Sequence, residues 1–311
     1  MDMKSQAQYK IKWARKFMPV LAEIGERFKE EQLFSDKKVG LCLHITPETA
    51  CLVEYLVESG AEIMITAANP LSSQPDIVEY LKTLKNVKVL GFRGMNAEDL
   101  NKSLEDIINW EPDFVMDDGA ELVIKAQEMA NTSLKGATEE TATGYYKLLK
   151  YEDDNMLKIP VIATSFSFCH NLFDNKHGTS QSVIDGIIRA TNTMIAGKTI
   201  VVAGYGQCGS TFAKKVWGMG ANVIVCEVSP QRALEAALDG FRILPMEKAA
   251  EEGDVFCTFT GNINVIRKEH IEKMKDNTII CNAGHYNVEI DIVALDDMAK
   301  SIDKARNNVT E

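Results

Sequence analysis

A glycine-rich turn between a hydrophobic run and an amphipathic run constrains the fold of this chain more than any other feature. The run at residues 199–203 leads directly into Gly204-Tyr-Gly206-Gln-Cys-Gly209, and apolar residues recur at helical spacing after it. In such a turn the first glycine allows a tight bend, the second lets a pyrophosphate approach the backbone, and the third lets helix and strand touch. The following helix directs free N–H groups and its positive dipole end toward the phosphates. The sequence therefore predicts a Rossmann-type dinucleotide site.

The acid expected at such a site stands at the end of the next predicted strand. Residues 222–226 form a hydrophobic run that ends at Glu227, about 20 residues after the glycines, where a carboxylate binds the ribose 2′-OH. Because a carboxylate repels a 2′-phosphate, Glu227 favours NAD over NADP, whereas Arg232 is of the type that accommodates that phosphate. The alternative is a glycine turn that binds nothing. Further cofactor contacts are predicted in the glycine turn and in two loops after later strands: Gln207, Cys208, Thr260, Gly261, Asn262, Ala283 and Gly284.

Short apolar runs alternate with helical patterns along the whole chain, which predicts an α/β fold with parallel sheets. The strands are nearly continuous hydrophobic runs, as in sheets covered on both faces. They are expected at residues 39–45, 62–66, 87–92, 114–116, 160–163, 199–203, 222–226, 255–258 and 277–281. With roughly 100–200 residues per domain, 311 residues give two domains. We predict a substrate-binding α/β domain at residues 1–181 and a Rossmann NAD-binding domain at 182–311, with the helix at 182–196 as connection and hinge.

Charge and cysteine usage narrow the functional classes. The formal net charge of −11 argues against non-specific binding of nucleic acid. No segment approaches the roughly 18 apolar residues of a membrane helix, and the N-terminal residues lack the apolar core of a secretory signal. The seven cysteines form no C-x-x-C pair, and the five histidines are scattered. We therefore expect a cytoplasmic protein with reduced thiols, no metal site, and a small-molecule substrate.

Three polar segments occur in the N-terminal half: residues 44–49 and 117–119 follow predicted strands, and residues 138–144 lie in a predicted loop. Each has a purely structural alternative: a helix N-cap, a solvated acidic turn, and an exposed polar loop. Together they supply an imidazole, neighbouring carboxylates and hydroxyls at strand ends, which are the groups of a proton-transfer site.

The chain resembles the S-adenosylhomocysteine hydrolase (adenosylhomocysteinase) family. The resemblance rests on HITPETA (44–50), MDDGAEL (116–122), EETATG (139–144), LFDN (172–175), IDGIIRATNTMIAGK (184–198), VVAGYGQCG (201–209) and CNAGHYNVEID (281–291). It implies cleavage of the thioether between homocysteine and adenosine with tightly bound NAD. The cofactor oxidises the ribose 3′-OH, a base removes the 4′ proton, homocysteine leaves, water adds, and the ketone is reduced again.

The resemblance also implies roles for particular residues. His44 would assist departure of the thiol, Asp118 would be the base near the 4′ carbon, and His285 would lie near the reacting ribose. Thr46, Glu48 and Thr49 would bind substrate, while Glu140 and Asp174 would bind the ribose hydroxyls. Thr141, Thr143 and Asn175 would reach NAD.

Several positions depart from the family pattern. His170 stands where the family has the lysine at the ribose 3′-OH, and an imidazole can also accept that proton. Ser165 replaces a substrate-binding asparagine. The C-terminal segment that completes the family's pocket and reaches a neighbouring subunit is not in the sequence. The alternatives are therefore a divergent NAD-dependent nucleoside oxidoreductase and a silent NAD-binding regulatory paralogue. We expect a homo-oligomer, with a full-length homologue as another partner.

Overall fold

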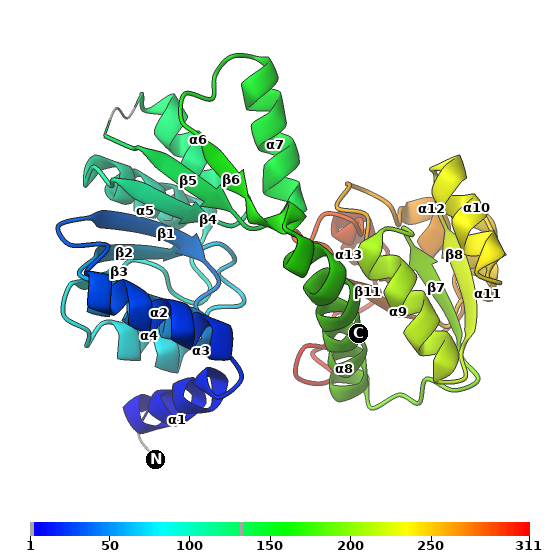
Figure 1. Cartoon of the computed structure of the whole chain (residues 1–311). Helices are drawn as coiled ribbons and strands as arrows, with labels where there is room; N and C mark the ends of the chain where they lie inside the picture. Colours follow the sequence, from blue (N-terminus) through cyan, green and yellow to red (C-terminus); the bar gives the residue numbers. More distant parts are fainter. Residues whose placement is uncertain (1–2, 131–132) are drawn as a thin grey trace. The chain divides into compact units, whose positions relative to one another are not determined.

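The computed structural model describes residues 3–130 and 133–311 (Figure 1). The chain divides into two compact units, Met1–Phe166 and Ser167–Glu311, each of which is described by itself. The division lies 15 residues before the boundary expected between residues 181 and 182. The segment at 170–179 packs on helices of the second unit, which explains the difference. The helix expected as a connection, residues 182–196, is observed as α8 (Ser180–Thr191) and belongs to the second unit.

The first unit is built on a six-stranded parallel sheet with strand order β3-β2-β1-β4-β5-β6. Its strands are β1 (Lys38–Leu43), β2 (Glu62–Ala67), β3 (Val87–Val89), β4 (Phe114–Asp117), β5 (Gly136–Glu139) and β6 (Val161–Ala163). Its helices are α1 (Met3–Arg15), α2 (Pro19–Glu31), α3 (Pro47–Glu58), α4 (Pro75–Leu81), α5 (Ala97–Asn109), α6 (Glu121–Glu128) and α7 (Ala142–Asp153), with a 3₁₀ turn at Thr164–Phe166.

Successive side chains of each strand point to opposite sides of this sheet, and helices cover both faces. Val39 and Leu41 of β1 pack with α1, α3 and α4, whereas Cys42 packs with α5 and α6. The nearly continuous hydrophobic runs in the sequence follow from this double covering.

The second unit has a five-stranded parallel sheet with order β11-β10-β7-β8-β9. Its strands are β7 (Thr199–Ala203), β8 (Asn222–Cys226), β9 (Arg242–Ile243), β10 (Val255–Thr258) and β11 (Ile279–Asn282). Besides α8, its helices are α9 (Gln207–Gly218), α10 (Pro230–Leu238), α11 (Met246–Glu252), α12 (Lys268–Ile271) and α13 (Ile292–Met298), and residues His170–Thr179 form a π-helix. The predicted α/β fold with a Rossmann-type second domain is thus confirmed.

Strand order reverses once in each sheet, between β1 and β4 and between β7 and β10. In parallel α/β sheets the connections leave such a point to opposite sides, so a crevice opens outside the carboxyl ends of the two strands. The residues directly after these four strands are therefore the first place to look for ligands.

One predicted loop is partly regular structure. The segment at 138–144 contains the end of β5, the N-cap Thr141 and the start of α7. The prediction of a loop was wrong because β5 consists of small and polar residues, yet it is hydrogen-bonded between β4 and β6. Within the described residues, no helix combines the length and apolar character needed to cross a membrane.

Candidate functional site

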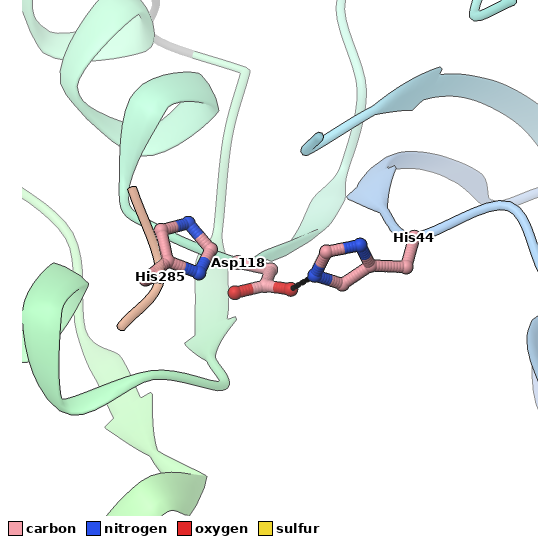
Figure 2. Close-up of side chains that lie close together, drawn as sticks. All are labelled: His44, Asp118 and His285. Carbon is pink, nitrogen blue, oxygen red and sulfur yellow. Dashed lines mark ion pairs between the residues drawn. The ribbon is translucent and has the colours of Figure 1, made fainter. Parts of the chain in front are cut away.

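The reversal point of the first sheet brings together an imidazole and a carboxylate. His44 follows β1 directly and Asp118 follows β4, and these two strands are neighbours. The Nε2 atom of His44 lies 3.1 Å from Oδ2 of Asp118 (Figure 2). Asp118 is almost fully buried, whereas about a third of the His44 side chain is exposed. A ligand can therefore reach His44 more easily than the buried Asp118.

The charge state of His44 follows from its surroundings. The hydrogen bond to Asp118, together with the charges of Asp118 and Glu140, raises the pKa of the imidazole above its usual value, although partial burial opposes this effect. Folding thus shifts the titration of the His44 ring to higher pH. Because the folded-state pKa is raised, this ion pair stabilises the first unit below the unfolded-state pKa. The contribution is lost as pH rises through the folded-state pKa.

Two further carboxyl groups hold the turn that carries Asp118. Asp117 accepts hydrogen bonds from the backbone N–H groups of Asp118 and Val123, at 3.0 and 2.8 Å. Glu139 accepts from the N–H groups of Gly119 and Ala120, both at 2.9 Å. Burial raises the pKa of Asp117 to about 7 and raises that of Glu139 above its usual value. Neither residue was among the predicted site residues.

A hollow of about 410 Å³ opens beside His44 within the first unit. It collects the residues predicted for substrate binding together with an apolar wall: Met18, Leu21, Leu43, His44, Thr46, Glu48, Thr49, Leu52 and Glu140. Thr46 is also the N-cap of α3, with its hydroxyl accepting from the N–H of Thr49. Thr46 is thus a helix N-cap, as the structural alternative expected, and it also lines the hollow.

In the second unit the glycine turn has the geometry that the sequence predicts. Gly204 has a φ of +98°, and a Cβ on Gly209 would lie 2.0 Å from the carbonyl oxygen of Gly204. Gly206 is the N-cap of α9, and among the described residues no side chain caps this helix start. A helix start without a side-chain cap is suited to binding an anion. Gln207 and Cys208 form the first turn of the helix.

Glu227 and Arg232 lie against the same turn. The Glu227 carboxylate accepts from the N–H groups of Tyr205 and Ser229 at 2.7 and 2.8 Å. A Cβ on Gly206 would lie 3.2 Å from a guanidinium nitrogen of Arg232. An anion-binding helix start, a cradle that only glycine leaves open and a carboxylate at the end of the second strand are the features that fit NAD.

A buried glutamate organises the two remaining cofactor-side loops. Glu289 accepts from the N–H and hydroxyl of Thr260 at 2.9 and 2.6 Å, and from the N–H of Gly261 at 3.0 Å. A Cβ on Gly284 would lie 1.8 Å from Glu289 Oε1. These loops follow β10 and β11, and the predicted contacts Asn262 and Ala283 lie in them. Glu289 was not among the predicted site residues, although it lies in the motif CNAGHYNVEID (281–291).

The other predicted residues divide between the two units. His170, Asp174 and Asn175 lie in the π-helix of the second unit, where Nδ1 of His170 is 3.1 Å from Oδ2 of Asp174. His285, which Figure 2 also labels, belongs to the second unit and packs edge-on against Tyr286. In the first unit, Thr141 caps α7 and donates its hydroxyl to Glu139, and Thr143 lies in the first turn of α7.

Comparison with known proteins gives concordant matches for both units. A family model described as S-adenosyl-L-homocysteine hydrolase matches residues 1–131, and one described as its NAD binding domain matches residues 175–311. An adenosylhomocysteinase of Archaeoglobus fulgidus is 49% identical over 305 residues, which are 97% of this chain and 75% of that protein. An S-inosyl-L-homocysteine hydrolase of Methanocaldococcus jannaschii is 48% identical over 310 residues, or 98% and 74% of the two chains.

Among solved structures, a dipicolinate synthase component of Bacillus halodurans superposes with a TM-score of 0.54. The match covers 85% of this chain and 88% of that one, at 14% sequence identity. At this identity the likeness concerns the fold alone.

The hydrogen bond from His44 to Asp118 predicts a measurable change in acidity. In the variant Asp118→Asn the pKa of His44 should fall, because the imidazolium loses its charged acceptor while partial burial remains. Glu140→Gln should lower the same pKa by less. Titration of the His44 ring signals by NMR measures both changes, and equal pKa values in wild type and Asp118→Asn would contradict the assignment.

The close approach of Gly209 to Gly204 predicts a requirement for glycine in NAD binding. Gly209→Ala places a Cβ against a backbone oxygen and should weaken NAD binding about tenfold or more, which corresponds to ~1.4 kcal/mol. Gly218→Ala, at the other end of α9, meets nothing within 4 Å and serves as the control. Calorimetric titration with NAD compares the two, and equal affinities would refute the proposed turn.

Proposed function

The chain belongs to the S-adenosyl-L-homocysteine hydrolase family, and on that premise we propose that it cleaves the C5′–S bond of S-adenosyl-L-homocysteine through transient oxidation at the ribose 3′ carbon. The enzyme is an NAD-dependent thioether hydrolase. The observation that supports the proposed chemistry is the His44–Asp118 pair at the edge of a hollow that also holds Thr46 and Glu48.

Bound NAD, held by the glycine turn and Glu227, would supply the hydride acceptor for oxidation at the ribose 3′ carbon and the hydride donor for the final reduction. Asp118 is the base that takes the proton from the 4′ carbon, which the neighbouring ketone acidifies. His44, whose pKa is raised by the hydrogen bond to Asp118, gives its Nε2 proton to the sulfur as the C5′–S bond breaks and the sulfur keeps the electron pair. Water then adds at C5′ and the proton at C4′ is restored, so the cycle closes without net oxidation.

His170 is the proposed base for the 3′-hydroxyl proton. Its Nδ1 is paired with Asp174 within one π-helix, which leaves Nε2 for the substrate. An imidazole can perform this step near neutral pH, and it replaces the lysine expected from the family. Asp174 and Glu140 are proposed to bind the ribose hydroxyls, and His285 to lie near the reacting ribose.

The cofactor contacts are proposed from the geometry of the second unit. The glycine turn and α9 would hold the pyrophosphate, and Glu227 the ribose 2′-OH. The remaining contacts are proposed for Gln207, Cys208, Arg232, Thr260, Gly261, Asn262, Ala283 and Gly284. The family resemblance, and not the geometry of the second unit, suggests Thr141, Thr143 and Asn175 as further NAD contacts.

Glu48 is compatible with two nucleoside bases. Its carboxylate only accepts hydrogen bonds, and it lines the hollow with Thr46. The N6 amino group of adenine offers a donor to it, and so does the N1–H of hypoxanthine. Because a relative 48% identical is an S-inosyl-L-homocysteine hydrolase, S-inosyl-L-homocysteine is the second candidate substrate.

We further propose that the protein works in the cytoplasm as a homo-oligomer. The seven cysteines are all free thiols in the structure, as expected in a reducing compartment. Sedimentation of the purified chain, alone and mixed with a full-length relative, measures the assembly.

The proposal predicts which thioether is hydrolysed. We expect homocysteine release from S-adenosyl-L-homocysteine with a higher kcat/KM than from S-inosyl-L-homocysteine. Glu48→Gln should lower kcat/KM for the preferred substrate about 10–100-fold, since a hydrogen bond to a charged group contributes ~1.5–3 kcal/mol. Glu98→Gln, on the exposed first turn of α5, is the matched control.

Three other outcomes of this assay would change the functional assignment. A higher kcat/KM for the inosine thioether would move the assignment to the second candidate. Reduction of bound NAD by a nucleoside without thiol release would favour a nucleoside oxidoreductase. Bound NAD that responds to neither nucleoside would favour a silent paralogue.

A further inference from the structure

The hydroxyl of Ser72 lies between a backbone carbonyl and the imidazole of His44. Its Oγ is 2.8 Å from the carbonyl oxygen of Asn69 and 2.5 Å from Nδ1 of His44. A carbonyl can only accept, and a serine hydroxyl has one proton to give. The proton therefore lies toward Asn69, because two oxygens 2.8 Å apart without a proton between them would repel each other. Ser72 then offers a lone pair to Nδ1, so Nδ1 of His44 carries a hydrogen.

The turn that carries Ser72 is fixed by several hydrogen bonds. The N–H of Leu71 donates to the side chain of Asn69 at 2.9 Å, and the N–H of Ser72 donates to the Asn69 carbonyl at 3.1 Å. The guanidinium of Arg93 donates to the Leu71 carbonyl at 2.6 Å. The turn begins just after β2, whose last residue, Ala67, pairs with Leu43 beside His44. The backbone thus holds the serine hydroxyl in place against the imidazole.

A hydrogen fixed on Nδ1 leaves Nε2 as the nitrogen that exchanges a proton. With Nδ1 occupied, Nε2 is the atom that gains or loses a proton, and it lies 3.1 Å from Asp118. Two carboxylates of the first unit, Asp118 and Glu140, act on this ring. In the opposite tautomer the proton would lie permanently on Nε2, and the basic lone pair would point at Ser72.

We propose that Ser72 is a positioning residue that selects the Nδ1–H tautomer of His44 and thereby directs the exchangeable proton to Nε2. The inference rests on the proposed function for its catalytic consequence. In that function, Nε2 gives its proton to the homocysteine sulfur as the C5′–S bond breaks, and takes a proton back when the direction is reversed. Ser72 touches neither substrate nor cofactor in this role, and acts only through His44.

The neighbouring serine offers a matched control. Ser73 is fully buried, and its Oγ has no hydrogen-bond partner among the described residues. Ser73→Ala removes a hydroxyl from the same turn without touching His44, whereas Ser72→Ala removes the acceptor for Nδ1. Ser72→Thr keeps a hydroxyl and serves as the conservative variant.

The direct test is nitrogen-15 NMR of the His44 ring above its pKa. We expect the wild type and Ser73→Ala to show a protonated Nδ1 and an unprotonated Nε2, and Ser72→Ala to lose this pattern. A wild-type ring with its hydrogen on Nε2 would overturn the proposal, as would an unchanged pattern in Ser72→Ala. This arm needs no substrate, so it decides the role of Ser72 even if the proposed function fails.

Steady-state kinetics of thioether cleavage provide a second test. Ser72→Ala should lower kcat for thioether cleavage about tenfold with little change in KM, and Ser72→Thr should restore most of it. The alkaline limb of the pH profile should move to lower pH, because the imidazolium loses the acceptor of its Nδ1–H. Oxidation of the ribose, followed by the reduced-nicotinamide absorbance, should be unaffected. Equal kcat and equal pH limbs in Ser72→Ala and Ser73→Ala would overturn the proposal.

Discussion

The reversal of strand order in a parallel sheet is the constraint on which the proposed chemistry depends. In the first unit it makes β1 and β4 neighbours, so residues 74 positions apart, His44 and Asp118, meet where both strands end. In the second unit it places the glycine turn after β7 beside the loop after β10. A Cβ on Gly204 would lie 3.0 Å from the Thr260 side chain, which shows how closely these two segments approach. Each unit thus provides a ligand-binding edge by the same rule.

Each edge also has a buried glutamate that accepts hydrogen bonds from its loops. Glu139 accepts from three backbone N–H groups and the Thr141 hydroxyl, and Glu289 accepts from two N–H groups and the Thr260 hydroxyl. A buried carboxylate is costly unless its oxygens are satisfied, so the loops must keep the geometry that satisfies them. Gly144 and Gly284 leave the space that these carboxylates occupy. The loops are therefore held in one geometry at the proposed substrate and cofactor sites.

The sequence predicted what depends on local periodicity and spacing. The glycines, Glu227 and the alternation of strands and helices are local signals, and the structure places them as expected. Ser72 and Glu139 were missed because their roles arise from tertiary contacts between segments that follow neighbouring strands, which local spacing does not show. The strand β5 was missed because its few polar residues carry no hydrophobic pattern. The first unit ends at Phe166, before the predicted domain boundary at residue 181, because the π-helix packs on α8 and α9. Composition does not reveal this packing.

The most direct test of the account is a single turnover of Asp118→Asn, with NAD bound, on S-adenosyl-L-homocysteine. Reduced-nicotinamide absorbance and released thiol would be followed in the same sample. If Asp118 removes the 4′ proton, the variant should oxidise the ribose at a rate close to that of the wild type and release almost no homocysteine. Thiol release at the wild-type rate would contradict the role of the His44–Asp118 pair and, with it, the proposed site at the edge of the first sheet.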